Sequence, residues 1–207
     1  MTGQSLRDRQ RAQIRADIRR AAFRLFIERG YDAVTTEEIA TAAGVSARTF
    51  FRHVPTKEEL LLAPVRHGGA AIVGLLEQRP ASEPPDLALI NAIITRTRSF
   101  AEADTEEWRE ALLVAPDLLG KLTVHTPDDK ERAKKLVAAR MGTNPDSDTR
   151  PGLLVQLAFA AADFAFQQWV RQSTKKPQAL DRYVTEALDA VKSPYWQGKG
   201  RSAGARM

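Results

Sequence analysis

Residues 34–60 read VTTEEIATAAGVSARTFFRHVPTKEEL, and this stretch decides the fold. Its spacing predicts two short helices joined by a tight turn, followed by the start of a third helix. Thr35 and Glu38 have the spacing of a capping box, in which each side chain accepts a hydrogen bond from the other residue's backbone N–H. Thr36 is the alternative cap. Gly44 is expected to end the first helix in the left-handed conformation, because glycine has no Cβ to clash.

Ser46 is the predicted cap of the second helix, which covers residues 47–53. Phe50 and Val54 lie four residues apart on one side of this helix and are expected to be buried. The opposite side is predicted to be exposed and carries Arg48, Thr49, Phe51, Arg52 and His53. A short, basic, exposed helix held by a small core is the form that lies in the major groove of DNA.

Residues 43–60 carry the pattern AGVSxxTFFRHxPTKEEL, which closely resembles the signature of the TetR family of bacterial transcription regulators. The resemblance is strong over roughly the first 65 residues, and beyond them only the layout of helices is similar. It implies an all-α fold with an N-terminal three-helix helix-turn-helix domain, a C-terminal helical ligand-binding and dimerisation domain, and a homodimer. An unrelated helical hairpin with a glycine turn is the alternative. The family usually has tyrosine where this chain has Phe51, so one phosphate hydrogen bond is lost.

The exposed helix and the resemblance together predict which residues touch double-stranded DNA. Base edges or the groove wall are assigned to Arg48, Thr49, Phe51 and Arg52. Phosphates are assigned to Ser46, His53, Thr56 and Lys57, and Thr36 is also counted among the DNA contacts. Two such helices on a two-fold axis require a near-palindromic operator with half-sites about one helical turn, or a multiple of it, apart.

The composition is typical of a soluble globular protein: 207 residues, 43% hydrophobic and 28% charged, with a formal net charge of +5. Alternating β-branched runs are nearly absent, which favours an all-helical fold. The positive charge favours a polyanionic partner. Arginine dominates the predicted first helix, residues 7–29, where Arg7, Arg9 or Arg11 could reach DNA. A solvated helix face is the alternative for these arginines.

Several function classes lack their motifs in this sequence. There is no cysteine and the three histidines lie far apart, so neither a disulfide nor a metal site is expected. No glycine-rich phosphate loop or nucleophile elbow occurs, so no enzyme and no cofactor is predicted. The sequence has neither the apolar core of a signal peptide nor a run of about 18 apolar residues, which predicts a cytoplasmic protein without a membrane span.

Three segments are predicted along the chain. They are a helix-turn-helix DNA-binding domain over residues 1–56, a helical ligand-binding and dimerisation domain over residues 57–192, and a disordered basic tail over residues 193–207. Within the second segment, the proline-rich residues 79–86 are expected to form a linker.

One helix is expected to run from Thr56 towards residue 78. Pro64 should kink or interrupt it, because proline has no N–H to donate, and the glycines at 68 and 69 should soften it. A helix with weak points between two sites could transmit a signal. Another helix is expected over residues 87–103, with a core stripe at Leu87, Ile90 and Ile94.

Five residues are candidate ligand contacts: Asn91, Thr95, Trp108, His125 and Asp163. A surface position or a hydrogen bond to the backbone is the alternative for Asn91 and Thr95, and core packing is the alternative for Trp108 and His125. Asp163 interrupts an otherwise apolar helix, and a buried carboxylate needs a partner, water or a proton. Arg96, Arg98 or a polar group of a ligand are the candidate partners.

The last two helices are predicted over residues 152–171 and 178–192. The first is apolar on all sides and rich in alanine, which is typical of a helix buried on both faces. The pair resembles the family's C-terminal dimer bundle, to which each subunit gives two helices. We therefore expect a homodimer through these helices.

Together these features predict a sequence-specific DNA-binding regulator, and specifically a repressor that a small apolar or amphipathic molecule releases from its operator. The string RTFFRHVPTKEEL and the helix layout also resemble actinobacterial members of the family, including the mycofactocin-regulator subgroup, whose ligands are thought to be acyl-CoA-like. The alternatives are a ligand-independent DNA-binding regulator and a helical enzyme.

Overall fold

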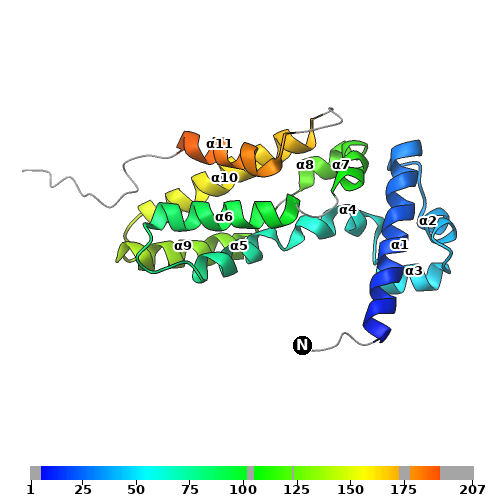
Figure 1. Ribbon diagram of the computed structural model, residues 1–207, viewed down its shortest axis with the longest axis horizontal. Helices are drawn as coiled ribbons and strands as arrows, with labels where there is room; N and C mark the ends of the chain where they lie inside the picture. The colour runs from blue at the N-terminus through cyan, green and yellow to red at the C-terminus, as the bar shows by residue number, and fades with distance from the viewer. Residues whose placement is uncertain (1–5, 102–104, 123, 173–177, 192–207) are drawn as a thin grey trace, which may run out of the picture. The chain divides into compact units, whose positions relative to one another are not determined.

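The computed structural model describes residues 6–101, 105–122, 124–172 and 178–191, and within these ranges helix is the only regular secondary structure (Figure 1). The predicted all-α fold is confirmed. The predicted tail, residues 193–207, lies outside the described residues.

The chain divides into two compact units. Unit 1 contains residues 1–66 and 104–122, and unit 2 contains residues 67–103 and 123–207. This division differs from the predicted boundary after residue 56, because the unit that holds the helix-turn-helix extends by ten residues and also takes in a later segment.

In its described part, unit 1 consists of helices that follow one another closely in the first half of the chain, plus two short ones from the later segment. They are α1 (Leu6–Arg29), α2 (Thr36–Ala42), α3 (Ala47–His53), α4 (Lys57–Arg66), α7 (Glu106–Leu113) and α8 (Pro116–Lys121). Helix α1 packs against α2, α3 and α7, and α7 also packs against α4 and α8. The long first helix therefore supports α2, α3 and α7, and α4 and α8 are attached through α7.

Burial in unit 1 follows the helical period. Ile18, Ala22 and Phe26 recur every four residues along α1 and are fully buried, as one apolar stripe of an amphipathic helix requires. Trp108 of α7 is 2% exposed, and its indole N–H donates a hydrogen bond of 2.8 Å to the carbonyl of Leu61 in α4. This bond satisfies the polar end of a buried aromatic side chain and ties the later segment to the first.

The predicted caps of the helix-turn-helix are confirmed. The Thr35 hydroxyl accepts from the N–H of Glu38 at 3.2 Å, and the Glu38 carboxylate accepts from the N–H of Thr35 at 2.9 Å. That N–H holds the pKa of Glu38 below its usual range. Gly44 ends the turn at a φ of +68°, and Ser46 accepts from the N–H of Thr49. Local interactions thus fix both ends of the turn.

The described helices of unit 2 run roughly side by side (Figure 1). They are α5 (Gly68–Glu77), α6 (Pro85–Ala101), α9 (Pro127–Met141), α10 (Arg150–Val170) and α11 (Leu180–Val191). Helix α10 packs against α6, α9 and α11, and α5 packs against α6 and α9. Arg140 of α9 donates to the carbonyls of Leu76, Arg79 and Pro80, which closes the end of α5.

The helix expected from Thr56 towards residue 78 is interrupted, as predicted. Helix α4 ends at Arg66, two residues after Pro64, and α5 begins at Gly68. The glycines at 68 and 69 allow close packing of neighbouring residues against the start of α5, rather than making the helix flexible. A Cβ on Gly68 would lie 2.6 Å from Cγ1 of Val124, and a Cβ on Gly69 would overlap the Asp129 carboxylate.

Two segments are long and apolar enough to cross a membrane by length and composition alone: residues 47–77 and α10. The first is interrupted by residues 54–56 after α3 and by the single turn residue His67 after α4. In α10, more than half of the apolar window is buried inside unit 2. A core helix of a soluble protein has the same properties, so these segments are weak evidence for a membrane span.

Replacing Gly44 with alanine should lower the free energy of unfolding by about 1–2 kcal/mol, because an L residue is strained in the left-handed conformation. No atom lies within 4 Å of a Cβ at this position, so the backbone alone sets the cost. Gly74→Ala is the matched control, since its Cβ is equally free but its backbone is helical within α5, and it should stabilise by up to about 1 kcal/mol. Urea unfolding followed by circular dichroism measures both, and equal effects of the two substitutions would contradict this account.

Candidate nucleic-acid interface

Helix α3 presents one face to solvent and buries the other. Phe50 is fully buried and Val54 is 5% exposed, so this side of the helix is fixed to the core of unit 1. Phe51 is 48% exposed and meets the edge of the Phe50 ring, with centroids 5.4 Å apart. The rest of the predicted DNA-facing side is exposed at Arg48 and Arg52, and half-buried at Thr49 and His53. The predicted orientation of α3 is therefore present in the structure.

Three of the predicted DNA contacts are hydroxyl residues at helix starts, and two of them, Ser46 and Thr56, are caps. Ser46 caps α3, and its hydroxyl also donates to that of Thr49 at 3.0 Å. Thr56 accepts from the N–H of Glu59 at the start of α4. Thr36 is the first residue of α2, and its hydroxyl donates to the Glu37 carboxylate at 3.0 Å. Hydroxyls at helix starts lie where backbone N–H groups also attract anions. Contact of these residues with DNA stays a prediction.

Lys57 has an unexpected position. Its ammonium donates to the carbonyl of Tyr31 at 3.0 Å and to that of Val34 at 3.1 Å, and it lies 4.3 Å from the centroid of the Tyr31 ring. Two of its three N–H donors are thus engaged in joining the start of α4 to the loop between α1 and α2. The predicted phosphate contact of Lys57 stays a prediction, with one donor left for it.

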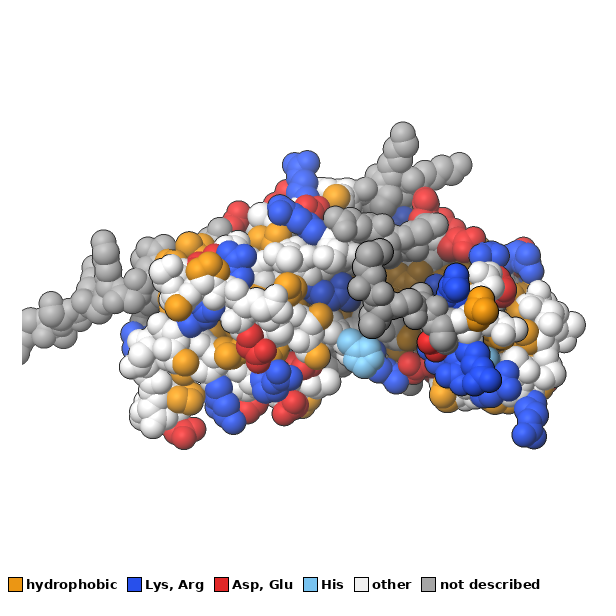
Figure 2. Space-filling view, turned by 60° about the horizontal axis from the view of Figure 1, so that its bottom comes forward, with side chains coloured by type: hydrophobic (Ala, Val, Ile, Leu, Met, Phe, Trp, Pro, Cys, Tyr) orange, Lys and Arg blue, Asp and Glu red, His pale blue; other side chains and the backbone are white. Residues whose placement is uncertain are grey.

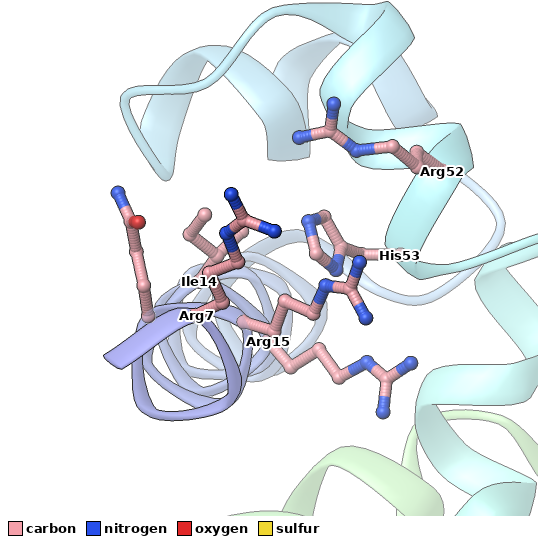
Figure 3. Close-up of a pocket in the computed structure, with 7 residues that line it drawn as sticks. Arg7, Ile14, Arg15, Arg52 and His53 are labelled. Carbon is pink, nitrogen blue, oxygen red and sulfur yellow. The ribbon is translucent and has the colours of Figure 1, made fainter. Parts of the chain in front are cut away.

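A groove runs between the N-terminal half of α1 and the C-terminal end of α3, with a volume of about 530 Å³. Its charged lining is Arg7, Arg11, Arg15, Arg52 and His53. Figure 3 shows the side chains of Arg7 and Arg15 leaving α1 toward the side of the groove that carries Arg52 and His53. Arg7, Arg9 and Arg11 were predicted as arginines that could reach DNA, and of these Arg7 and Arg11 line the groove. Arg15 also lines it and was not predicted, although spacings of four place it on the same helix face as Arg7 and Arg11.

The groove is strongly cationic. None of its lining residues is acidic, and within the described residues none of its arginines forms an ion pair. Burial, followed by the nearby charges of Arg52, Arg15 and Arg11, lowers the pKa of His53 below its usual value. In Figure 2, basic side chains gather on the part of the molecule where Figure 1 places α1 to α3. A positively charged surface therefore lies beside α3.

Two of the candidate ligand contacts lie together in unit 2. His125 is 2% exposed, and its ring stacks on Phe159 of α10 with centroids 4.0 Å apart. Its Nδ1 lies 3.0 Å from Oδ1 of Asp163, without the alignment of a hydrogen bond, and the Asp163 side chain is 33% exposed. His125 is thus the partner of Asp163. The expectation of Arg96 or Arg98 was wrong.

The other candidate ligand contacts have partners of their own. The Asn91 amide donates to Glu83 at 2.7 Å, and the Thr95 hydroxyl donates to the carbonyl of Asn91, one turn earlier in α6. Trp108 belongs to unit 1, where it bonds Leu61. Among the five, the side chains of His125 and Asp163 lie together, and Thr95 meets the backbone of Asn91 within α6. A ligand role for any of the five stays a prediction.

A basic helix exposed on a capped helix-turn-helix, with a cationic groove beside it, defines a helix-turn-helix DNA-binding protein. Two protein-family models match the chain and agree with this class of protein. Residues 18–63 match the model described as bacterial regulatory proteins of the tetR family, and residues 83–195 match the model described as the MftR C-terminal domain. The chain belongs to the TetR family of bacterial transcription regulators.

Named relatives cover nearly the whole chain. It is 31% identical over 198 residues to the HTH-type transcriptional regulator TcmR of Streptomyces glaucescens, covering 92% of this chain and 88% of the relative. It is 26% identical over 186 residues to MftR of Mycobacterium tuberculosis, a transcriptional regulator named for mycofactocin biosynthesis, covering 88% and 89%. The chain is a DNA-binding transcription regulator, like these relatives, and not an enzyme.

The fold is also similar to a solved structure. The crystal structure of native NalD, the secondary repressor of a multidrug efflux pump in Pseudomonas aeruginosa, matches with a TM-score of 0.56 and 20% identity, covering 86% of this chain and 95% of NalD. This likeness supports the predicted arrangement of a helix-turn-helix followed by a helical C-terminal domain.

Replacing Lys57 with methionine should lower the free energy of unfolding by about 1–3 kcal/mol, because two buried carbonyls lose a charged donor. Amide exchange of the loop over residues 31–34 should become faster. Hydrogen exchange followed by mass spectrometry measures this, with Arg24→Ala as a control that removes one exposed charge from α1. Unchanged exchange in this loop would show that Lys57 does not hold it.

Proposed function

We propose that this regulator is a cytoplasmic repressor that binds a near-palindromic operator as a homodimer and leaves it when a small apolar or amphipathic molecule binds unit 2. The observation that carries the DNA part is the exposed face of α3, whose arginines have no ion-pair partner within the described residues. Unpaired guanidinium groups on a rigid helix can meet bases and phosphates without first breaking protein contacts.

The two arginines of α3 have separate roles in this proposal. Arg48 lies in the first turn, and N-terminal residues of a recognition helix contact base edges. An arginine in that place can donate two hydrogen bonds to guanine. Arg52 lies one turn later and lines the cationic groove of the protein. In this proposal it contacts the wall of the DNA major groove. Phe51, with half of its surface exposed, supplies an apolar contact to a thymine methyl group or a sugar.

Dimerisation is proposed through the exposed side of α10. Leu153, Leu157 and Phe164 are 48%, 37% and 61% exposed and recur at helical spacing. An exposed apolar row of this kind usually marks an interface. Helix α11 buries Leu180, Val184 and Leu188 inside unit 2 and contributes its remaining surface. A two-fold axis through α10 and α11 duplicates α3, which gives the operator its two half-sites.

The effector is proposed to bind within unit 2. His125 supplies a polar atom for it, because its buried Nε2 has no hydrogen-bond partner among the described residues. The surrounding helices are apolar, so an amphipathic molecule with one polar group fits this chemistry. The match to the MftR C-terminal domain supports the subgroup whose ligands are thought to be acyl-CoA-like. Such a ligand releases DNA by binding more tightly to the form that cannot grip the operator.

Replacing Arg48 with alanine should reduce affinity for the operator by about 10-fold to 100-fold and relax base preference at one position of each half-site, because a bidentate contact is worth about 1–3 kcal/mol. The operator is first selected from fragments of the protein's own genome, and binding is measured by fluorescence anisotropy. Arg24→Ala, which removes the same charge from α1, is the control. Equal discrimination between the operator and a scrambled duplex in wild type and Arg48→Ala would contradict the assignment of α3.

The same assay separates the proposed repressor from a ligand-independent DNA binder. Palmitoyl-CoA, used as an amphipathic probe, should raise the melting temperature and release the operator duplex together. If acyl-CoA probes of several chain lengths change neither, the effector class is wrong while the DNA assignment stands.

Replacing Phe164 or Leu157 with glutamate should shift the protein from dimer to monomer, because a charge buried between two copies of α10 loses its hydration. We expect the dissociation constant of the dimer to rise at least about 10-fold in light scattering during size-exclusion chromatography. Leu87→Glu is the matched control, since Leu87 is 38% exposed on α6. A Phe164→Glu protein that remains dimeric would place the interface elsewhere.

A further inference from the structure

The arginines that α1 contributes to the cationic groove are not among the proposed reading residues, which all lie on α3. We propose that this cationic groove is a second DNA-contact site. It holds phosphodiester groups of the duplex backbone that flank the DNA major groove read by α3. The proposal rests on the proposed function, since it requires α3 to be placed on duplex DNA.

The spacing of the arginines matches a linear polyanion. Arg7, Arg11 and Arg15 follow one another at every fourth residue, so they form a row about 12 Å long on α1. One strand of a duplex advances about 3.4 Å per phosphate along its axis. The row is therefore long enough to accompany more than one phosphate, whereas a single small anion would engage only part of it.

The charge of the groove calls for an anion. Four guanidinium groups share one hollow, and no carboxylate lines it. Like charges on one helix face repel one another, which favours the binding of an anion between them. Guanidinium groups donate two parallel hydrogen bonds to phosphate oxygens, and arginine is the residue that such sites favour. A phosphodiester in the groove would replace repulsion with attraction.

Arg52 connects the groove to the reading face. It belongs to the exposed side of α3 and also lines the groove. Figure 3 shows Arg52 and His53 on α3 facing the side chains that come from α1. A duplex contacted by Arg52 would therefore have its nearest backbone over the hollow. This continuity favours duplex DNA over a separate anionic partner.

His53 adds a dependence on pH. The groups that face it are Arg7, Arg11, Arg15 and Arg19 of α1, Arg52 of α3 and Glu59 of α4. Glu59 is already paired with Arg66, so the surroundings of His53 are mainly positive. Burial and these arginines lower the pKa of His53, and the ring is neutral at pH 7 in the free protein. A phosphate in the groove would raise this pKa, so DNA binding takes up a proton.

The sign of the pH effect follows from linkage. Because the complex binds more protons than the free protein, the affinity should increase as pH falls through the interval between the pKa of free His53, below 6.5, and its higher pKa in the complex. Above this interval both states carry neutral His53 and the affinity should no longer change. His53→Gln should lose this dependence, while His67→Gln should keep it.

The experiment uses the full-length protein and two fluorescein-labelled duplexes, the selected operator and a 30-base-pair duplex of scrambled sequence. Arg11→Ala and Arg15→Ala should each weaken binding to both duplexes by about threefold to tenfold, and each should reduce the slope of log affinity against log salt by about 0.9. Arg24→Ala, which removes one exposed arginine of α1 outside the groove, should leave the slope unchanged. Circular dichroism spectra of all variants confirm that they are folded.

One outcome would overturn the groove proposal, and a second would overturn the role of His53 within it. If the slopes of log affinity against log salt for Arg11→Ala and Arg15→Ala equal the slope for Arg24→Ala, these arginines do not contact phosphates. If the affinity of His53→Gln for DNA still depends on pH, His53 is not the group that takes up the proton. Failure of the proposed function has a different signature, because the wild-type protein would then bind operator and scrambled duplexes equally well. In that case reduced salt slopes in the α1 variants would still support the groove as a site for DNA phosphates.

Discussion

The burial of Phe50 is the interaction on which the DNA-binding unit depends. Helix α3 has seven residues, and a helix of this length does not persist alone in water. A fully buried phenylalanine contributes roughly 2–3 kcal/mol through removal of its surface from water. Because Phe50 fixes one side of α3 to the core around α1, the opposite side has only one orientation left. The position of every residue proposed to read DNA follows from that constraint.

The sequence allowed prediction wherever short-range chemistry decides the structure. The capping box of Thr35 and Glu38, the left-handed Gly44 and the Ser46 cap depend on residues at most three apart, and all are present. The helix also breaks close to Pro64, but Pro64 lies inside α4 and the break follows at residue 67, where the N–H of Gly69 donates to the carbonyl of Val124. The exposed face of α3 followed from the helical period once Phe50 was assigned to the core.

Long-range packing accounts for what the sequence did not predict. Leu87 was placed in the core stripe of its helix but is 38% exposed, while Ala88 and Leu89 are fully buried. Helix α6 is packed against several neighbours, so a broad part of its surface is apolar and the sequence leaves its rotation ambiguous. The attachment of Lys57 to two loop carbonyls has no signal in residue spacing. The partner of Asp163 was missed for the same reason, because His125 comes from a distant loop.

The division of the chain into units has a practical consequence for exchange of DNA-binding parts between regulators. Residues 1–66 do not contain all of unit 1, since Trp108, Ala111 and Leu112 of α7 are buried and α7 packs against α1 and α4. A hybrid that transplants only the N-terminal segment would leave these apolar side chains behind and uncover the surface of α1 beneath them. Recombination in evolution meets the same obstacle, because residues 104–122 would have to be exchanged together with residues 1–66. Their exchange needs two further breakpoints within the rest of the chain.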